Sequence, residues 1–256
     1  MEPLFEYYIE SDKLHFKYAK GEPAVKDQEF HDYHEFVLFL GGNAFFISKY
    51  IQQDLTAGSL ILIPKEQFHQ FCVRQPENYL RCILKFRETP EIVGLIREVM
   101  NSVKIITATD TAVRSVFEHL MDIVKSRLSD EEKKLYLYSA LLQLLIDIKR
   151  KPFTAISNNV NLSPIVRHAL SIIDEKYAES LSVEQLAELL YVSPSTLAHK
   201  FSKELNISVY RYLTKKRLSA AHELIQQGEA LTTAATLSGF RDYSCFYRLY
   251  KKYYQK

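Results

Sequence analysis

Two histidines, a tyrosine and a glutamate in the first third of the chain are the side chains best suited to chemistry. His31, Tyr33 and Glu35 fall within one short segment, and His69 lies further along. Imidazole and carboxylate groups can bind a divalent metal ion, and together with a phenol they can also hydrogen-bond a small polar molecule. Side chains on a strand alternate between its faces, so we expect His31, Tyr33 and Glu35 on one face and His34 on the other.

Three uses of these side chains stay open. One use is a metal ion bound by His31, Glu35 and His69. However, His31 and His34 are three residues apart, so they point to opposite faces of a strand and cannot both bind an ion. We therefore expect no metal or cofactor. We favour a small polar ligand inside an otherwise apolar interior, hydrogen-bonded by His31, Tyr33, Glu35, His69 and Arg81. The third use is an internal network of polar groups that binds nothing.

The sequence around these residues predicts short antiparallel strands. Phe36–Leu40 is rich in β-formers and is followed by Gly41-Gly42-Asn43, a turn that predicts Ala44–Lys49 as the return strand. Further strands follow at regular spacing over Leu60–Ile63, Phe68–Val73 and Tyr79–Phe86. This pattern predicts a small antiparallel barrel or sandwich from about residue 4 to residue 86.

From Pro90 the apolar period changes from two to about 3.6 residues, which predicts helices. Glu91–Met100 forms the first helix. Asp110 caps a second, whose apolar face consists of Val113, Val116, Phe117, Leu120 and Val124. Ser129 or Asp130 caps a third, whose wide apolar stripe consists of Leu135, Tyr138, Leu141, Leu142, Leu145 and Ile148.

A helix-turn-helix pattern begins at Ser182. Ser182 and Gln185 form a capping box that opens a helix with apolar residues at helical spacing. The helix stops before Ser193-Pro194, where serine caps and proline occupies the first turn of a second helix through Leu205. Ala187 is small where two crossing helices must approach closely.

The same pattern recurs near the end of the chain. At an offset of 48 residues, Val183 and Ala187 match Leu231 and Ala235. At an offset of 49 the second helices match, with Leu197, His199, Phe201 and Lys203 opposite Phe246, Arg248, Tyr250 and Lys252. One extra residue in the second turn explains the shift. A repeated, capped helix-turn-helix favours DNA binding over an ordinary helical hairpin.

This repeat resembles the DNA-binding region of AraC/XylS-family transcription regulators, which carry two helix-turn-helix units joined by a long helix. The matching residues are Leu181–Ala187, Val192–Leu197, Phe201, Arg217, Ala221, Leu224, Leu231-Thr232, Ala235, Gly239-Phe240, Asp242, Phe246, Arg248 and Lys251-Lys252. The resemblance covers about the last third of the chain, and it implies an all-α domain that binds double-stranded promoter DNA.

The resemblance also implies which residues face the DNA. The family's base-contacting positions correspond to Ser195, Thr196, Ala198 and His199 in the first unit and to Tyr243, Ser244, Tyr247 and Arg248 in the second. His199 has the longest hydrogen-bond reach in the first set, and Arg248 could contact a guanine or a phosphate. The residues better placed for phosphates are Lys200, Lys203, Lys251 and Lys252.

The N-terminal region looks like the cupin-type sensor domain of the same family. The resemblance spans roughly residues 25 to 86 and rests on His31–Phe36, Gly42, Ala57–Leu60, Ile63-Pro64 and His69. It implies an α+β chain with a cupin-like ligand-sensing barrel over residues 1–90 and a helical dimerisation region over 91–150. A polar linker over 151–161 and the double helix-turn-helix domain over 162–256 complete the predicted organisation.

The positive charge gathers where the helix-turn-helix units lie. The net charge is +2, but from Lys200 onward the chain has 11 Lys and Arg against 4 Asp and Glu. A basic surplus at this place suits contact with phosphates. The cysteines, Cys72, Cys82 and Cys245, show no CxxC spacing, and no stretch reaches membrane-spanning length, so we expect a cytoplasmic protein away from membranes.

Together these patterns predict a homodimeric transcription activator controlled by a small-molecule effector, plausibly a sugar or related metabolite, with RNA polymerase as a further partner. No P-loop, dinucleotide fingerprint or nucleophile with an adjacent base predicts another chemistry, and we expect no enzyme. Two alternatives stay open: a cupin-type metal-dependent enzyme, and a regulator whose barrel serves only as a dimerisation scaffold.

Overall fold

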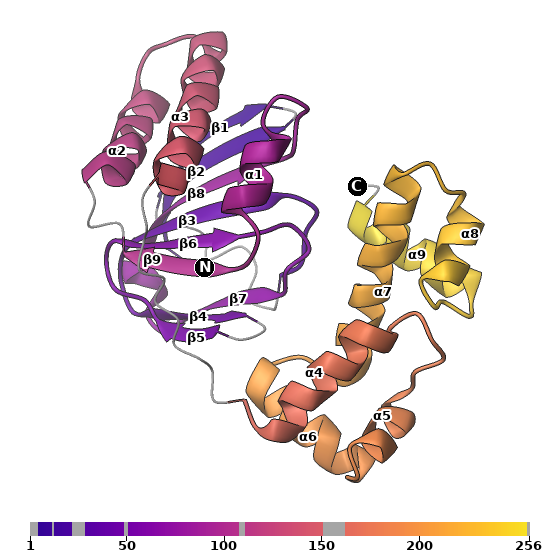
Figure 1. Cartoon of the computed structure of the whole chain (residues 1–256). Coiled ribbons are helices and arrows are strands. Elements are labelled where there is room, and N and C mark those ends of the chain that lie inside the picture. The colour runs from indigo at the N-terminus through magenta and orange to yellow at the C-terminus, as the bar shows by residue number, and fades with distance from the viewer. Residues whose placement is uncertain are drawn as a thin grey trace. The chain divides into compact units, whose positions relative to one another are not determined.

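The chain divides into two compact units, residues 1–159 and 160–256, in a computed structural model (Figure 1). The structure describes residues 5–11, 13–21, 29–48, 51–107, 111–150 and 162–254. The predicted linker over residues 151–161 and the predicted cap Asp110 lie outside the described residues. Where described, the first unit combines antiparallel sheets with helices and the second is helical, which confirms the predicted fold class.

The described residues of the first unit form two antiparallel sheets. The larger has the strand order β1-β2-β8-β3-β6-β9 and the smaller the order β5-β4-β7. The larger sheet consists of β1 (Phe5–Ser11), β2 (Leu14–Lys20), β8 (Leu80–Phe86), β3 (His34–Gly41), β6 (Ser59–Ile63) and β9 (Lys104–Thr107). The smaller consists of β5 (Ile51–Asp54), β4 (Ala44–Ser48) and β7 (His69–Val73). Strand β9 lies within the region that the apolar period predicts as helical, and it extends the sheet by pairing with β6.

The turn after β3 does not form the predicted hairpin ladder. β3 pairs with β6 and β8, whereas β4 pairs with β5 and β7. The chain therefore crosses from the larger sheet to the smaller one at residues 41–43. The crossing brings Phe46 of β4 against Val37 of β3, because the inner faces of both sheets are apolar and pack together.

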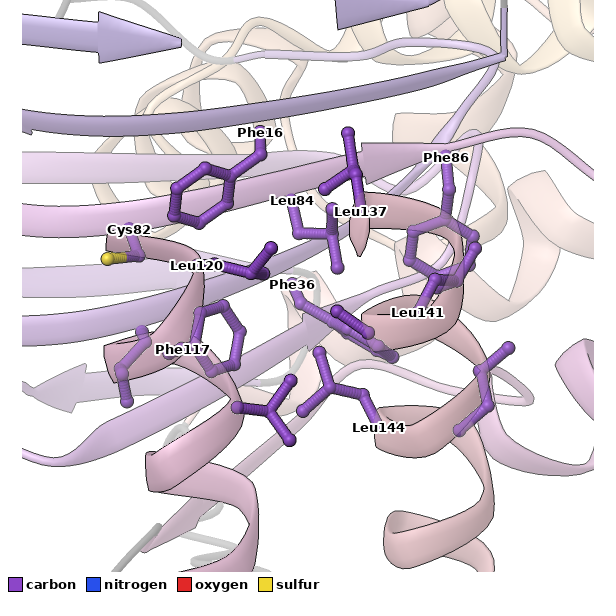
Figure 2. Close-up of a cluster of buried hydrophobic side chains, with 14 of the residues drawn as sticks. Phe16, Phe36, Cys82, Leu84, Phe86, Phe117, Leu120, Leu137, Leu141 and Leu144 are labelled. Carbon is purple, nitrogen blue, oxygen red and sulfur yellow. The ribbon is translucent and has the colours of Figure 1, made fainter. Parts of the chain in front are cut away.

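Three helices cover the outer face of the larger sheet. They are α1 (Val93–Val99), α2 (Thr111–Lys125) and α3 (Asp130–Arg150). Figure 2 shows Phe117 of α2 and Leu141 of α3 in one buried cluster with Phe36 and Leu84 of the sheet. Each such side chain contributes about 1.5–3 kcal/mol when fully buried. The predicted face of α2 is buried.

The predicted apolar stripe of α3 divides between core and surface. Leu135 and Tyr138 are 72% and 39% exposed, contrary to the prediction that they share a face with the core residues. The buried face consists of Leu137, Ala140, Leu141, Leu144, Leu145 and Ile148. A helix with apolar residues on more than one side can pack only one side on a sheet, so a second apolar side stays exposed.

The second unit contains two helix-turn-helix pairs joined by a long helix. Its described helices are α4 (Pro164–Lys176), α5 (Val183–Leu189), α6 (Pro194–Leu205), α7 (Val209–Gln226), α8 (Leu231–Leu237) and α9 (Tyr243–Tyr254). The predicted capping box is present: Ser182 Oγ accepts from the Gln185 backbone N–H at 3.2 Å, and the Gln185 side chain accepts from the Ser182 backbone N–H at 2.9 Å. None of the helices in the described ranges has the length and apolarity that crossing a membrane requires.

Helix α7 supplies a buried face to both pairs. In the first pair, Phe201 of α6 meets Tyr212 of α7 edge-on, with ring centres 5.6 Å apart. In the second pair, Phe246 of α9 and Ala235 of α8 pack against Leu218 of α7. The small side chains of the first helix in each pair let the helices approach closely, as expected.

Two glycines in this unit, Gly228 and Gly239, both have positive φ angles but differ in how closely other atoms surround them. Gly239 has a φ of +89°, and a Cβ there would lie 2.8 Å from the carbonyl oxygens of Tyr177 and Ala178. Gly228 has a φ of +100° with nothing within 4 Å of an added Cβ. Both alanine variants carry left-handed strain of about 1–2 kcal/mol, but only Gly239→Ala must displace backbone.

We expect Gly239→Ala to lower the free energy of unfolding of this unit by at least about 1 kcal/mol more than Gly228→Ala does. Urea unfolding followed by far-UV circular dichroism measures the difference. Equal losses for the two variants would contradict a rigid contact at Gly239.

Candidate nucleic-acid interface and ligand site

The exposed face of α6 carries the predicted DNA-contacting residues of the first unit. Ser193 caps the helix by accepting a hydrogen bond from the Thr196 backbone N–H at 3.1 Å. The buried face consists of Leu197, Phe201 and Leu205. The opposite face leaves Ser195, Thr196, Ala198, His199 and Lys203 exposed, with Lys200 half-buried. All of these except Ala198 line one surface hollow together with Glu204, so the structure brings the predicted residues together.

Helix α9 presents two rows of polar and aromatic side chains. Residues four positions apart share a helix face. The exposed rows are therefore Tyr243, Tyr247 and Lys251 on one side, and Ser244, Arg248 and Lys252 on the other. The rings of Tyr243 and Tyr247 stack with centres 6.1 Å apart. All six predicted residues of the second unit thus lie on the solvent side of one helix, while Phe246 and Tyr250 are buried.

Part of the basic surplus supports the fold instead of facing solvent. Lys215 of α7 is only 3% exposed. Lys216 forms an ion pair with Asp174 at 3.3 Å. Arg217 donates hydrogen bonds to the carbonyl oxygens of Tyr177, Glu179 and Leu181 at 2.6, 2.9 and 3.2 Å. The charge count along the sequence therefore overstates the cations available to phosphates.

In the first unit, His31, Glu35 and His69 meet on the inner side of the two sheets. Glu35 lies on β3, His69 on β7, and His31 just before β3. Oε2 of Glu35 is 3.3 Å from Nε2 of His31 and 3.5 Å from Nε2 of His69. The side chains are 9%, 5% and 0% exposed for His31, Glu35 and His69. With Tyr33, which stacks on His31, the structure therefore brings together four of the five predicted ligand residues.

His31 reaches Glu35 through a bend and not through strand alternation. β3 begins at His34, so residues 31–33 lie ahead of the strand, contrary to the sequence prediction. The bend stacks the His31 ring on the Tyr33 ring with centres 3.8 Å apart, and His31 Nδ1 lies 2.9 Å from the Tyr33 carbonyl oxygen. His34 points to the opposite face, as predicted.

Lys85 joins this cluster, and the sequence prediction missed it. Its Nζ donates a hydrogen bond to Tyr33 Oη at 3.1 Å, and it pairs with Glu35 across β3 and β8. Arg81, which was predicted, pairs with Phe39 instead, four residues or about 13 Å along the strand. Side chains alternate along β8, so Lys85 lies on the same face as Arg81, and this alternation could have predicted Lys85 from the sequence.

Burial and neighbours set the charge of the cluster. Burial would raise the pKa of the Glu35 carboxyl, but His31 and His69 outweigh it and hold that pKa well below its usual range. Burial lowers the pKa of His31, and neighbouring Glu35 only partly opposes this effect. Burial also opposes protonation of His69, yet Glu35 raises the pKa of that ring above its ordinary value. Burial, with Glu35 nearby, raises the pKa of Tyr33 to about 12, which keeps the phenol neutral and able to donate.

This arrangement can hold either a small polar molecule or a cation. Tyr33 and Lys85 offer hydrogen-bond donors beside a buried carboxylate. Within the described ranges, His31, Glu35 and His69 are the group whose nitrogen and oxygen atoms could hold a metal ion, since their ligand atoms lie within 4.8 Å of one another.

Comparison with known proteins matches both units. A family described as an AraC-like ligand binding domain matches residues 19–141, and one described as a helix-turn-helix domain matches residues 186–256. The uncharacterized HTH-type transcriptional regulator YbfI of Bacillus subtilis is 25% identical over 233 residues, which cover 88% of this chain and 82% of that protein.

Two further relatives match over shorter stretches. The uncharacterized HTH-type transcriptional regulator YijO of Escherichia coli is 37% identical over 81 residues, which cover 31% of this chain and 29% of that protein. The Lactose operon transcription activator of Staphylococcus xylosus is 22% identical over 159 residues, which cover 61% of this chain and 57% of that protein. The chain thus spans less than two thirds of the length of these two relatives. Because a ligand-binding match precedes a helix-turn-helix match, and because each unit has the residues that its pattern predicts, the chain belongs to the AraC/XylS family of transcription regulators.

Proposed function

We propose that this protein activates transcription by binding promoter DNA in a sequence-specific manner, under the control of a small-molecule effector. The observation that carries the proposal is the pair of helices α6 and α9, each with an apolar face in the core and a polar face in solvent. An α-helix of this kind fits the major groove, where side chains can reach base edges.

Each helix carries one residue suited to contacting bases and further residues suited to contacting phosphates. His199 on α6 and Arg248 on α9 are the exposed residues whose donors reach base edges best. Ala198 could at most pack on a thymine methyl group. Lys203, Lys251 and Lys252 have exposed ammonium groups suited to phosphates, and half-buried Lys200 assists.

Replacing Arg248 and Lys252 separately tests this division, since the two side chains lie one turn apart on one row of α9. We expect Arg248→Ala to weaken binding to a selected fragment by about 1–3 kcal/mol and to reduce its preference over bulk DNA. Lys252→Ala should weaken binding to all fragments alike and reduce the salt slope by about 1. Binding to genomic fragments, including the region upstream of the gene itself, across a salt series measures both effects.

Glu223→Ala, on an exposed site of α7 outside both faces, is the control. Failure of the wild-type protein to select any fragment over bulk DNA, with or without candidate sugars, would contradict the proposed function.

We propose a sugar or related metabolite as the effector class. One relative is named for the lactose operon, and the cluster around Glu35 offers polar groups inside an otherwise apolar interior. Tyr33 and Lys85 would donate hydrogen bonds to hydroxyl oxygens, and Glu35 would accept one. Arg81, further along the same face, would hydrogen-bond a ligand long enough to reach it. Control requires the effector to favour one arrangement of the protein, because tight binding alone shifts no equilibrium.

We also propose that the protein forms a homodimer through the α3 stripe, which consists of Leu135, Tyr138, Leu142 and Ile146. These residues follow helical spacing, with Leu135, Tyr138 and Ile146 exposed and Leu142 packed partly against the edge of the core. Leu135 and Ile146 are 72% and 46% exposed, and Leu142 is half-buried. A second copy of the same stripe would cover these side chains in an isologous contact.

A charge placed in the α3 stripe should separate the protomers. We expect Leu135→Asp to weaken dimerisation at least about tenfold, because a buried carboxylate without a partner is costly. Gln143→Asp introduces the same charge on the same helix outside the stripe and should leave the dimer intact. Sedimentation velocity over a concentration series measures both. A wild-type monomer, or an unaffected Leu135→Asp dimer, would contradict this interface.

RNA polymerase is the further partner we propose, since an activator must increase its recruitment or activity at the promoter. Location in the cytoplasm follows from a task at promoter DNA. The relatives named above are regulators, and we propose no catalytic role. The same DNA-binding experiment separates this proposal from a metal-dependent enzyme, which would show turnover without selecting DNA.

A further inference from the structure

Both histidines of the cluster are held with their Nδ1 atoms against backbone carbonyls. His31 Nδ1 lies 2.9 Å from the Tyr33 carbonyl oxygen, and His69 Nδ1 lies 3.0 Å from that of Gln67. A carbonyl oxygen only accepts, so each Nδ1 must carry the proton and donate it. In a neutral ring this tautomer leaves a lone pair on Nε2. Such backbone contacts are the usual means by which proteins orient metal-binding histidines.

When both rings are neutral, their Nε2 lone pairs converge on a carboxylate oxygen that also accepts. Glu35 favours a proton on His69 that removes this conflict, and a bound metal ion would take the place of that proton. Nε2 of His31 and Nε2 of His69 both face Oε2 of Glu35, and neither nitrogen makes a hydrogen bond of good geometry to any described residue. A charge-assisted hydrogen bond to a carboxylate would bring nitrogen and oxygen to about 2.7–2.9 Å. The observed separations of 3.3 and 3.5 Å are longer. They match two edges of a tetrahedron around Zn²⁺, which are about 3.4 Å for ligand atoms about 2.0–2.1 Å from the ion. The three ligand atoms together lie within 4.8 Å of one another, so the two histidine nitrogens must draw closer when the ion binds.

We propose that His31, Glu35 and His69 bind a divalent transition-metal ion of the Zn²⁺ type. Two imidazole nitrogens and one carboxylate oxygen suit Zn²⁺, whereas Mg²⁺ and Ca²⁺ prefer oxygen ligands alone. The buried cluster excludes water that would compete for the ligands. Since Glu35 belongs to the larger sheet and His69 to the smaller, the ion cross-links the two sheets.

Three protein ligands leave a position for a fourth. Glu29 pairs with His69 through backbone hydrogen bonds of 2.7 and 3.2 Å, so the two side chains leave the backbone on the same face. Its carboxylate is therefore one candidate for that position. The alternative occupant is an oxygen of the effector, and in this respect the inference deepens the proposed function and rests on it. Metal binding itself does not depend on DNA binding.

Zn²⁺ added to protein purified without a metal-chelating tag and stripped with EDTA tests the site. Isothermal titration should give one Zn²⁺ per chain, and Co²⁺ in its place should give the visible absorption of a tetrahedral ion without a thiolate charge-transfer band. Glu35→Gln and His69→Gln should each weaken Zn²⁺ binding at least about 100-fold, because each removes a direct ligand and second-shell changes alone cost about 10–100-fold.

His34→Gln is the matched control, because His34 is a buried histidine next to Glu35 that points to the opposite face. It should bind Zn²⁺ as the wild type does. Circular dichroism of each apo variant checks folding, and the wild-type Co²⁺ spectrum is decisive even where a variant does not fold. A folded wild-type protein that takes up no stoichiometric Zn²⁺, or Zn²⁺ binding that folded Glu35→Gln leaves unchanged, would overturn the proposal. Selective DNA binding measured on the same samples separates this outcome from failure of the proposed function.

Discussion

Burial of the central strand β3 on both faces is the constraint on which the N-terminal unit depends. On one face Phe36 and Leu38 pack under α2 and α3, and on the other Val37 and Phe39 pack against the smaller sheet. A strand in this position is expected to be apolar throughout. Glu35 breaks that rule, and a buried carboxylate is tolerated only where nearby groups stabilise its charge. The polar cluster around it is therefore a consequence of the two-layer packing.

The C-terminal unit depends on a shared helix in a similar way. Because α7 gives one part of its surface to α6 and another to α8 and α9, the two recognition helices have a common support. Basic side chains such as Arg217 contribute to this support by bonding to backbone carbonyls. These cations stabilise the fold and are therefore not available to DNA phosphates. Helix α9 has three exposed cations, Arg248, Lys251 and Lys252, whereas α6 has one, Lys203, together with half-buried Lys200 and mainly short polar side chains. This difference agrees with the proposed division of roles, in which α9 makes more of the phosphate contacts.

Under the proposed function, effector binding at Glu35 must alter the DNA-binding unit. A dimer through α3 gives one physical route, because α3 packs on the sheet whose opposite face carries Glu35. An ion between the sheets would link β3 to β7, and β3 lies directly under the helices. The coupling between effector binding and DNA binding can only be as large as the difference in the effector's affinity for two arrangements of the protein, one that binds DNA well and one that does not.

The sequence by itself determined the local elements of this protein. Local patterns fix the caps at Ser182 and Ser193 and the apolar faces of α2 and α6, because each depends on residues within a few turns of one another. The repeat of the helix-turn-helix was recognised by comparing such local patterns 48 to 49 residues apart. The outward position of Arg248 was implied by the resemblance to the family. Short β-rich runs likewise indicated most of the strands.

Only the tertiary structure decided how these elements combine. Whether β4 pairs with β3 or crosses to another sheet depends on which distant strands cover the inner face, and the turn residues do not encode it. Leu135 is exposed because only one of the two apolar sides of α3 packs on the sheet, and the sequence pattern does not say which. The meeting of His31, Glu35 and His69 required a bend ahead of β3 and the packing of two sheets, and Lys85 entered through its cross-strand register with Glu35. Contacts between residues far apart in sequence arise from packing, and a periodic pattern records only which side of an element is buried.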